Sequence, residues 1–231
     1  MTRTAALPQR RTARIDVAPL KKTDHAAYLD LLDLTTSGEG LPAEAAQILT
    51  LPPARPPFTH GPALCLTAHA RRTPHPVGAV FASLPDWTLQ HPLCQADPDL
   101  SDLLGDIALC VHGLAVAPSH RRHGIARALI TEAETRARST KYRLATLLHK
   151  PELAGFYQRL GYTTAHHVTI HLPDAAMGLT QPHSFMTAVK PLHPGVRVRT
   201  VPGAPGPVVT GLLPGCDLPP TARFHGGRLL P

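Results

Sequence analysis

The segment SHRRHGIARALI, residues 119–130, places two arginines and a histidine directly before a glycine and then continues as an apolar-periodic run. Ile125, Leu129 and Ala133 recur every four residues, which predicts an amphipathic helix over residues 121–138. A glycine inside a helical pattern costs about 1 kcal/mol relative to alanine, so Gly124 needs a physical reason. Close approach of a ligand to the backbone would supply one.

The residues before this helix predict a strand that leads into it. Residues 107–118, IALCVHGLAVAP, are apolar enough for a central strand. A strand ending at Val116 and a helix starting at Arg121 leave a short loop with unpaired backbone N–H groups, at the positive end of the helix dipole. A phosphate or pyrophosphate fits there, beside Gly124 and the small Ala126. A merely solvated helix face would also explain the arginines.

The rest of the chain predicts an α/β (α+β) fold with a mixed, mostly antiparallel sheet and helices on both faces. Strands are expected at residues 13–20, 63–70, 76–85, 107–118, 142–149, 164–172 and 184–192. Helices are expected from about residue 23, at 41–51, at 121–138 and from Pro151 to Gly161, with residues 86–106 as a polar connection. The strand–helix–strand passage in the middle favours one parallel pair.

Both ends of the chain are expected to lie outside the folded domain, which would span residues 13–190. Residues 1–12 are arginine-rich and contain no acid, which predicts a short disordered lead-in. Residues 191–231 are rich in proline and glycine and show no sustained hydrophobic period. They are therefore expected to form an irregular tail.

The composition limits the kinds of function that the sequence is compatible with. With 231 residues, a net charge of +7 and a mean hydropathy of −0.05, the chain is expected to be one soluble, cytoplasmic domain. No apolar run approaches the ~18 residues that span a bilayer, so no membrane partner is expected. Eighteen arginines and five lysines suit an anionic partner, either a phosphorylated small molecule or a nucleic acid. Few aromatic residues accompany the terminal arginines, which argues against nucleic acid.

Neither the cysteines nor the histidines predict a metal site. The four cysteines, at positions 65, 94, 110 and 216, form no CxxC pair, which excludes the usual zinc patterns and fits a reducing compartment. His167 and His171 would share one face of a strand but lie about 13 Å apart. One metal ion cannot bridge that distance, so no metal is expected.

Two motifs resemble a known family. RRHGIA at residues 121–126 is similar to the R/Q-x-x-G-x-G/A signature of the GNAT superfamily of acetyl-CoA-dependent N-acyltransferases, which also includes the upstream LAV at 114–116 and Pro118. LAGFYQRLGY at residues 153–162 resembles the final helix of that family, A-x-x-F-Y-x-x-x-G-F/Y. One predicted strand separates the two motifs, as in the family. The resemblance implies a GNAT-like fold with acetyl-CoA as cosubstrate.

Within the superfamily, the motifs are nearest to those of arylalkylamine N-acetyltransferase-like members. These carry FYQR-x-GF in the last helix and a histidine two residues before LAV, where this chain has His112. They also carry a second histidine two positions earlier, where this chain has Cys110. The paired-histidine proton relay of those members is therefore not carried over.

The resemblance also assigns roles to residues. The backbone of the LAV strand would pair with the pantetheine arm, and the following loop and helix start would hold the pyrophosphate; together these are Leu114, Ala115, Val116, Arg121, Arg122, His123, Gly124, Ile125, Ala126 and Arg127. Tyr157 matches the family's general acid, although core packing would also explain it. His112 is the candidate base, with a half-buried structural histidine as the alternative. Cys110 is the candidate for an acyl-cysteine route, or simply a buried residue.

The expected reaction is direct transfer of an acetyl group to the primary amine of a small molecule or peptide in a ternary complex. Trp87 and the acids between the third and fourth strands would attract a protonated amine, unless they form an ordinary charged loop; these acids are Asp97, Asp99, Asp102 and Asp106. A catalytically silent acyl-CoA-binding module is the alternative function. Family members often dimerise, so a homodimer is compatible with the resemblance.

Overall fold

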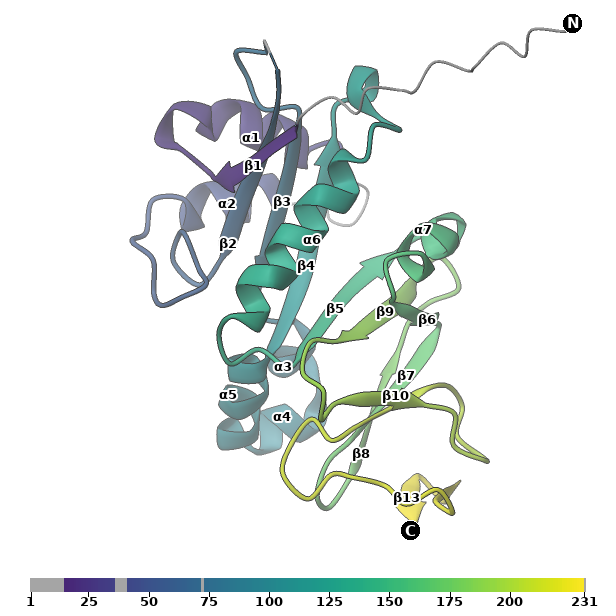
Figure 1. Ribbon diagram of the computed structural model, residues 1–231. Helices are drawn as coiled ribbons and strands as arrows, with labels where there is room; N and C mark the ends of the chain where they lie inside the picture. The colour runs from purple at the N-terminus through teal and green to yellow at the C-terminus, as the bar shows by residue number, and fades with distance from the viewer. Residues whose placement is uncertain (1–14, 36–40, 72, 231) are drawn as a thin grey trace, which may run out of the picture.

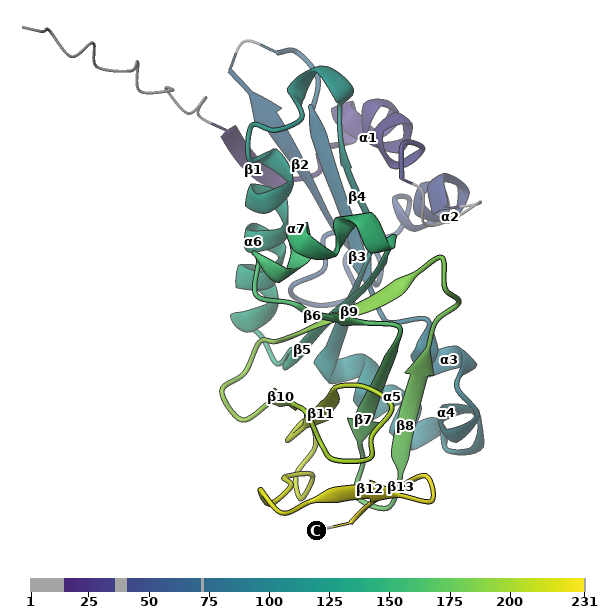
Figure 2. The same ribbon diagram turned by 90° about the vertical axis from the view of Figure 1, so that its right-hand side faces the viewer.

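The computed structural model describes residues 15–35, 41–71 and 73–230. The expected disordered lead-in at residues 1–12 lies outside these ranges. Figures 1 and 2 show an elongated molecule, with the N-terminal strands and helices at one end and the C-terminal strands at the other.

A seven-stranded sheet forms the main body, with strand order β1-β2-β3-β4-β5-β9-β6. The strands are β1 Ile15–Pro19, β2 Leu64–Ala70, β3 Gly78–Ser83, β4 Ala108–Val116, β5 Leu144–His149, β9 Met186–Pro191 and β6 Thr163–Ala165. All neighbours are antiparallel except β4 and β5, which run parallel. The prediction of a mixed, mostly antiparallel sheet is confirmed.

Helices cover both faces of this sheet (Figures 1 and 2). Helix α6, Ile125–Arg138, buries Leu129 and Ile130 against one face, together with even-numbered residues of β2 such as Leu66. Helices α1, His25–Leu32, and α2, Leu41–Ile48, cover the other face. Successive residues of a strand point to opposite faces of the sheet. Both faces of β2 and β3 are covered by helices, so these central strands have near-continuous apolar sequences.

Residues 86–106 are not the polar connection that was expected. They form three short helices, α3 Trp87–Gln90, α4 Pro92–Ala96 and α5 Pro98–Ile107. The Asp97 side chain caps α5 by accepting a hydrogen bond from the Leu100 N–H at 3.1 Å, and Pro98 occupies the first turn. Leu104 packs into the core. The aspartates at positions 97–106 therefore cap α5 or lie on its solvent-facing side.

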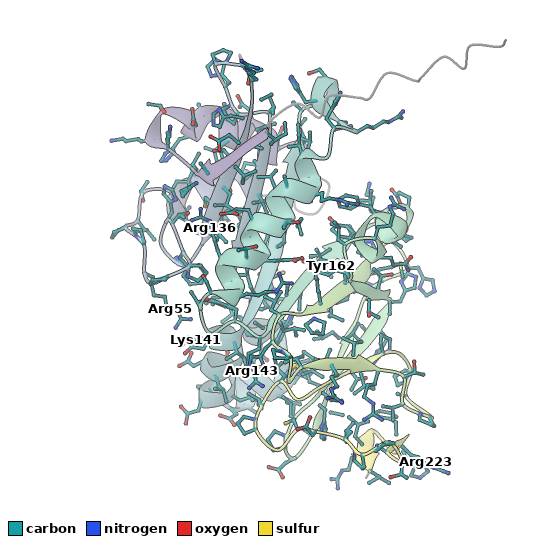
Figure 3. All side chains as sticks on the ribbon, in the orientation of Figure 1. Arg55, Arg136, Lys141, Arg143, Tyr162 and Arg223 are labelled. Atoms are coloured by element: carbon teal, nitrogen blue, oxygen red, sulfur yellow. The ribbon has the colours of Figure 1, made fainter. Side chains whose placement is uncertain are left out.

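The expectation that residues 191–231 form a tail outside the core is wrong. Strands β10 Arg197–Arg199 and β11 Val208–Thr210 join β7 His167–His171 and β8 Ala176–Thr180 in a second sheet, in the order β10-β11-β7-β8. Val209, Leu212 and Cys216 are fully buried in a core shared with residues of β5, α5 and β9. The Arg143 guanidinium also donates to the Gly211 carbonyl oxygen at 2.9 Å (Arg143 is labelled in Figure 3).

The last strands show why the sequence did not predict that residues 191–231 are folded. Apolar runs such as PVVTGLL are too short to display a period, and the glycines between them serve as turns: Gly203, Gly211 and Gly215 all have positive φ. A final hairpin, β12 Arg223–His225 with β13 Arg228–Leu230, completes the described chain. The single strand predicted at residues 164–172 divides between the two sheets, as β6 and β7.

His167 and His171 make separate structural contacts in the described part of the chain. The Nδ1 atoms of His167 and His171 bond to different partners, the Thr180 hydroxyl at 2.7 Å and the Cys216 carbonyl at 2.9 Å. The described residues contain no group of three or more side chains that could hold a metal ion. They also contain no helix long and apolar enough to cross a membrane.

A buried ion pair joins Lys190 of β9 to Glu134 of α6, and the same lysine bonds to the backbone at Leu160. The Lys190 ammonium lies 2.6 Å from Glu134 Oε2 and donates to the Leu160 carbonyl oxygen at 2.6 Å. The Glu134 side chain is only 5% exposed. Lys190→Met would leave Arg138, at 3.2 Å, as the cation paired with this carboxylate among the described residues.

We expect Lys190→Met to lower the free energy of unfolding by about 2 kcal/mol, less than the roughly 3–5 kcal/mol for breaking a fully buried pair, because Arg138 stays beside the carboxylate. Urea denaturation measures the change. Lys141→Met is the matched control: Lys141 binds Asp106 on the surface, as does Arg55 nearby (Figure 3). An exposed pair contributes less than about 1 kcal/mol. Equal losses in the two variants would contradict the role of Lys190.

Candidate active site

The parallel strands β4 and β5 separate halfway along their length. Their pairing covers Ala108–Val111 against Leu144–Leu147, and stops there. Beyond this point, among the described residues, no strand pairs with Leu114–Val116 on the side that faces β5. A strand edge of this kind offers backbone N–H and C=O groups to an extended ligand.

The loop after β4 is longer than the sequence predicted. Helix α6 begins at Ile125 rather than Arg121, because Arg122 and Gly124 adopt left-handed backbone angles, with φ of +64° and +80°. No side chain caps the helix at Gly124. A Cβ atom added to Gly124 would meet no atom within 4 Å, so the space in front of this turn is open. The uncapped N–H groups at the start of α6 therefore face a site suited to an anion.

A groove of about 610 Å³ runs along these elements and will be called the arginine groove. Nine of the ten residues predicted to hold the cofactor line it: Leu114, Ala115, Val116, Arg121, Arg122, Gly124, Ile125, Ala126 and Arg127. The tenth, His123, does not, because its ring turns back to the His120 carbonyl oxygen at 3.2 Å. His120 lines the groove instead, and Arg159 joins from the far side. Neither was predicted.

Positive charge in the arginine groove is not neutralised by neighbours. Arg121 donates from Nε to the Val116 carbonyl oxygen at 3.1 Å. None of the four arginines that line the groove forms an ion pair with a carboxylate of a described residue; they are Arg121, Arg122, Arg127 and Arg159. Such a concave positive surface attracts a ligand carrying several negative charges.

Tyr157 also lines the groove. It lies on the short helix α7, Ala154–Gln158, which follows the turn Pro151–Leu153 and stops before Gly161, a residue with φ of +86°. Its ring packs against His149, Phe156 and Tyr162, at centroid distances of 4.9, 5.0 and 5.9 Å. Burial raises the pKa of Tyr157 to about 12. The phenol therefore keeps its proton at neutral pH and can donate it.

Burial raises the pKa of all four tyrosines above 10, the usual value, and their titration should coincide with unfolding. Below pH 10 both folded and unfolded states keep these protons, so stability is unaffected. Above pH 10 the unfolded state loses them first, which lowers stability by about 1.4 kcal/mol per pH unit for each tyrosine. We expect phenolate absorbance to appear together with the loss of circular dichroism. Phenolate formation near pH 10 in a protein with native dichroism would contradict this.

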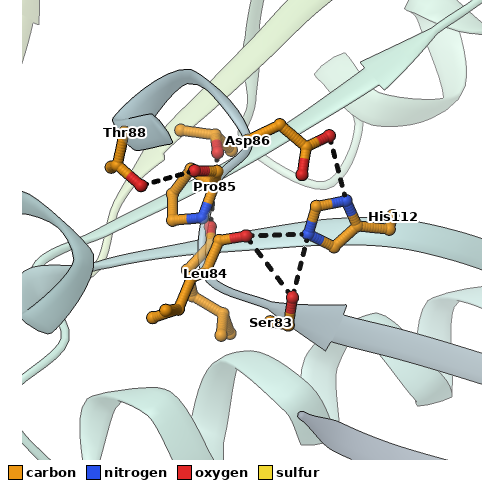
Figure 4. A network of polar contacts seen from close by, with 8 residues as sticks. Ser83, Leu84, Pro85, Asp86, Thr88 and His112 are labelled. Atoms are coloured by element: carbon orange, nitrogen blue, oxygen red, sulfur yellow. Dashed lines mark hydrogen bonds and ion pairs between the residues drawn. The ribbon is translucent and has the colours of Figure 1, made fainter. Parts of the chain in front are cut away.

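His112 occupies a β-bulge. Phe81 pairs with Gly113 and Ala82 with Val111, so His112 is the extra residue of β4. Its Nε2 lies 2.9 Å from the Leu84 carbonyl oxygen and 3.2 Å from the Ser83 hydroxyl (Figure 4). Because a carbonyl only accepts, Nε2 carries a hydrogen. Nδ1 faces Asp86, with its Oδ2 at 3.6 Å.

The bulge also separates His112 from Cys110, which a regular strand would place on the same side. Cys110 lines a different pocket of about 140 Å³ with Trp87 and Thr146. Burial raises the pKa of its thiol to about 12. A thiol is a poor nucleophile in that state, which argues against an acyl-cysteine route.

A second pocket of about 190 Å³ opens from the arginine groove at Tyr157, and will be called the histidine pocket. His112 and His149 line it, and it shares four lining residues with the groove: Leu34, Leu114, Leu153 and Tyr157. His149 was missed by the sequence analysis because it belongs to neither motif. Its Nδ1–H donates to the Lys150 carbonyl oxygen at 2.8 Å.

The acids expected near the acceptor do not line the histidine pocket. Asp97 caps α5, and Asp106 binds Arg55 and Lys141 on the surface. Asp99 and Asp102 lie on α5, and Trp87 lines the Cys110 pocket. These positions agree with the alternative prediction, in which the acids belong to an ordinary charged surface segment.

Comparison with known proteins agrees with this geometry. Residues 93–164, which include β4, the loop, α6, β5 and α7, match the family model of the acetyltransferase (GNAT) domain. This part of the chain is similar to a GNAT acetyltransferase domain. N-acetyltransferase Eis of Mycobacterium tuberculosis is 42% identical over 72 residues, which are 29% of this chain and 17% of that relative. The chain thus matches about a sixth of that relative's length.

Solved structures extend the likeness to the fold as a whole. Arabidopsis thaliana NAA60 in complex with acetyl-CoA has a TM-score of 0.51 at 15% identity, covering 76% of this chain and 96% of that structure. The GNAT family N-acetyltransferase YhbS of Escherichia coli in complex with CoA has a TM-score of 0.50 at 18% identity, covering 82% and 86%. The GNAT fold is confirmed. The nearer likeness to arylalkylamine N-acetyltransferases stays a prediction.

Proposed function

We propose that the protein is an acetyl-CoA-dependent N-acetyltransferase that acetylates a primary amine by direct transfer. One observation carries the proposal: the positive arginine groove and the histidine pocket share Tyr157 as a lining residue, and burial keeps its phenol protonated at neutral pH. A donor in the groove and an acceptor in the pocket would therefore approach each other at a group that can supply a proton. The family match over residues 93–164 supports the same reaction.

The groove suits the chemistry of acetyl-CoA. The unpaired edge at Leu114–Val116 offers hydrogen bonds to the amides of the pantetheine arm. The open space before Gly124 and the uncapped start of α6 suit the pyrophosphate. The four groove arginines would neutralise the phosphates, and the predicted contact from His123 is replaced in this proposal by His120 and Arg159.

The reaction needs one N–H bond and one C–S bond broken, and one N–C and one S–H bond formed. The amine attacks the thioester carbonyl carbon, and Tyr157 donates its proton to the departing sulfur. His112 accepts the amine proton at Nδ1, where Asp86 stabilises the resulting imidazolium. A proton returned to the tyrosinate completes the cycle. No covalent enzyme intermediate is needed.

The test has two parts: acetyl-CoA binding by calorimetry and CoA release with a thiol reagent over a panel of amines. Binding with turnover supports the enzyme. Binding without turnover of any amine favours the alternative, a silent acyl-CoA-binding module. Absence of binding overturns both. Burst labelling of the protein by radioactive acetyl-CoA, before product forms, would overturn direct transfer.

A further inference from the structure

Apolar side chains form part of the lining of the histidine pocket. Its described walls include Val111, Leu114 and Phe185. Three more leucines line it while remaining exposed: Leu34, Leu148 and Leu153, at 44%, 40% and 42%. They are three of the seven large hydrophobic side chains exposed in the described residues. Exposed apolar side chains that cluster around a pocket mark a binding surface rather than chance exposure.

The charged side chain that lines the histidine pocket, among the described residues, is positive. Lys150 is the only Lys, Arg, Asp or Glu among the described lining residues, and its ammonium forms no ion pair with a described residue. The carboxylate of Asp86, next to His112, lines the neighbouring Cys110 pocket instead. A second ammonium in this pocket would be repelled by that of Lys150. Polycationic amines are therefore disfavoured, and an acceptor with an anionic group is favoured.

The size of the pocket limits what can enter. Its volume of about 190 Å³ is below the ~300–1,000 Å³ of sites for drug-sized ligands. An acceptor that enters completely has the size of an amino acid. Its reacting nitrogen must lie near Tyr157, where the pocket meets the groove.

We propose that the acceptor is the α-amine of a free amino acid with an apolar side chain. The amine would face Tyr157 and His112, the side chain would contact the exposed leucines, and the carboxylate would pair with the Lys150 ammonium. The product is then an N-acetyl amino acid. Lys150 is the specificity-determining residue. This inference rests on the proposed N-acetyltransferase activity and adds the class of its acceptor.

Three acceptors that share the same amine and apolar side chain isolate the carboxylate: leucine, leucinamide and 3-methylbutylamine. Spermidine represents the polycations. We expect leucine to have a kcat/KM at least about tenfold above the other three, because one favourable ion pair in a partly enclosed pocket contributes about 1.4 kcal/mol. Lys150→Met should remove this advantage by raising the KM for leucine, with the kinetics of leucinamide unchanged. Lys141→Met, a surface control, should change neither.

Acetyl-CoA binding by calorimetry shows that each variant is folded and separates two kinds of failure. Absence of binding and of turnover with every amine overturns the proposed function itself. Three other outcomes overturn the acceptor class alone. They are acetyl-CoA binding without turnover of leucine, a wild-type preference for leucinamide or spermidine, and an equal loss for all acceptors in Lys150→Met.

Discussion

Tyr157→Phe is expected to lower kcat about 100- to 1,000-fold and to leave the affinity for acetyl-CoA unchanged. A positioned general acid contributes about 10²–10⁴-fold, and phenylalanine removes the donated proton while keeping the ring. The ring contacts with His149, Phe156 and Tyr162 are therefore retained. Steady-state kinetics with the best amine and calorimetry with acetyl-CoA measure the two quantities separately.

Tyr162→Phe is the matched control for this prediction. Tyr162 packs against Tyr157, and its hydroxyl is buried near Glu134. Removing that hydroxyl should change kcat less than about threefold, because it lies outside the groove and the histidine pocket. Similar losses of kcat in both variants would assign Tyr157 to core packing rather than to acid catalysis.

Gly124→Val is expected to weaken acetyl-CoA binding about 100-fold. Valine at φ of +80° strains the turn, and its side chain would fill the open space before the start of α6. An anion there would lose its close contact with the backbone N–H groups, and about 2.7 kcal/mol of binding corresponds to that factor. Calorimetry with acetyl-CoA measures it.

Gly215→Val separates the strain from the loss of the binding site. Gly215 also has positive φ, +76°, and a Cβ atom there would also meet no atom within 4 Å. It lies in the C-terminal turns and does not line the arginine groove. Both variants should lose similar folding stability, and only Gly124→Val should lose acetyl-CoA affinity. Unchanged affinity in Gly124→Val would place the pyrophosphate elsewhere.

The arginine groove could be predicted well because its parts are close in sequence. The edge of β4, the loop and the start of α6 occupy residues 114–127, and the backbone itself makes most of the site. His123 was the exception among the predicted groove residues. A positive φ at Arg122 and Gly124 rotates successive side chains away from helical positions, so that His120 lines the groove instead.

The histidine pocket could not be predicted as a whole because its wall comes from distant segments. Leu34 follows α1, Lys150 follows β5, and Phe185 precedes β9. No local pattern links these positions. Nor does strand periodicity reveal the bulge that separates His112 from Cys110, since it arises from pairing with β3.

The sequence by itself determined the motifs at residues 121–126 and 153–162, the central β4–α6–β5–α7 order and the position of Tyr157 on α7, because these depend on local spacing and on hydrophobic period. Only the tertiary structure decided that residues 196–216 belong to the core, that 86–107 contain three helices, and which side chains line the histidine pocket. Burial of short apolar runs such as Val208–Thr210 depends on pairing with β7, far away in the chain. Such long-range pairing leaves no period in the sequence to be found.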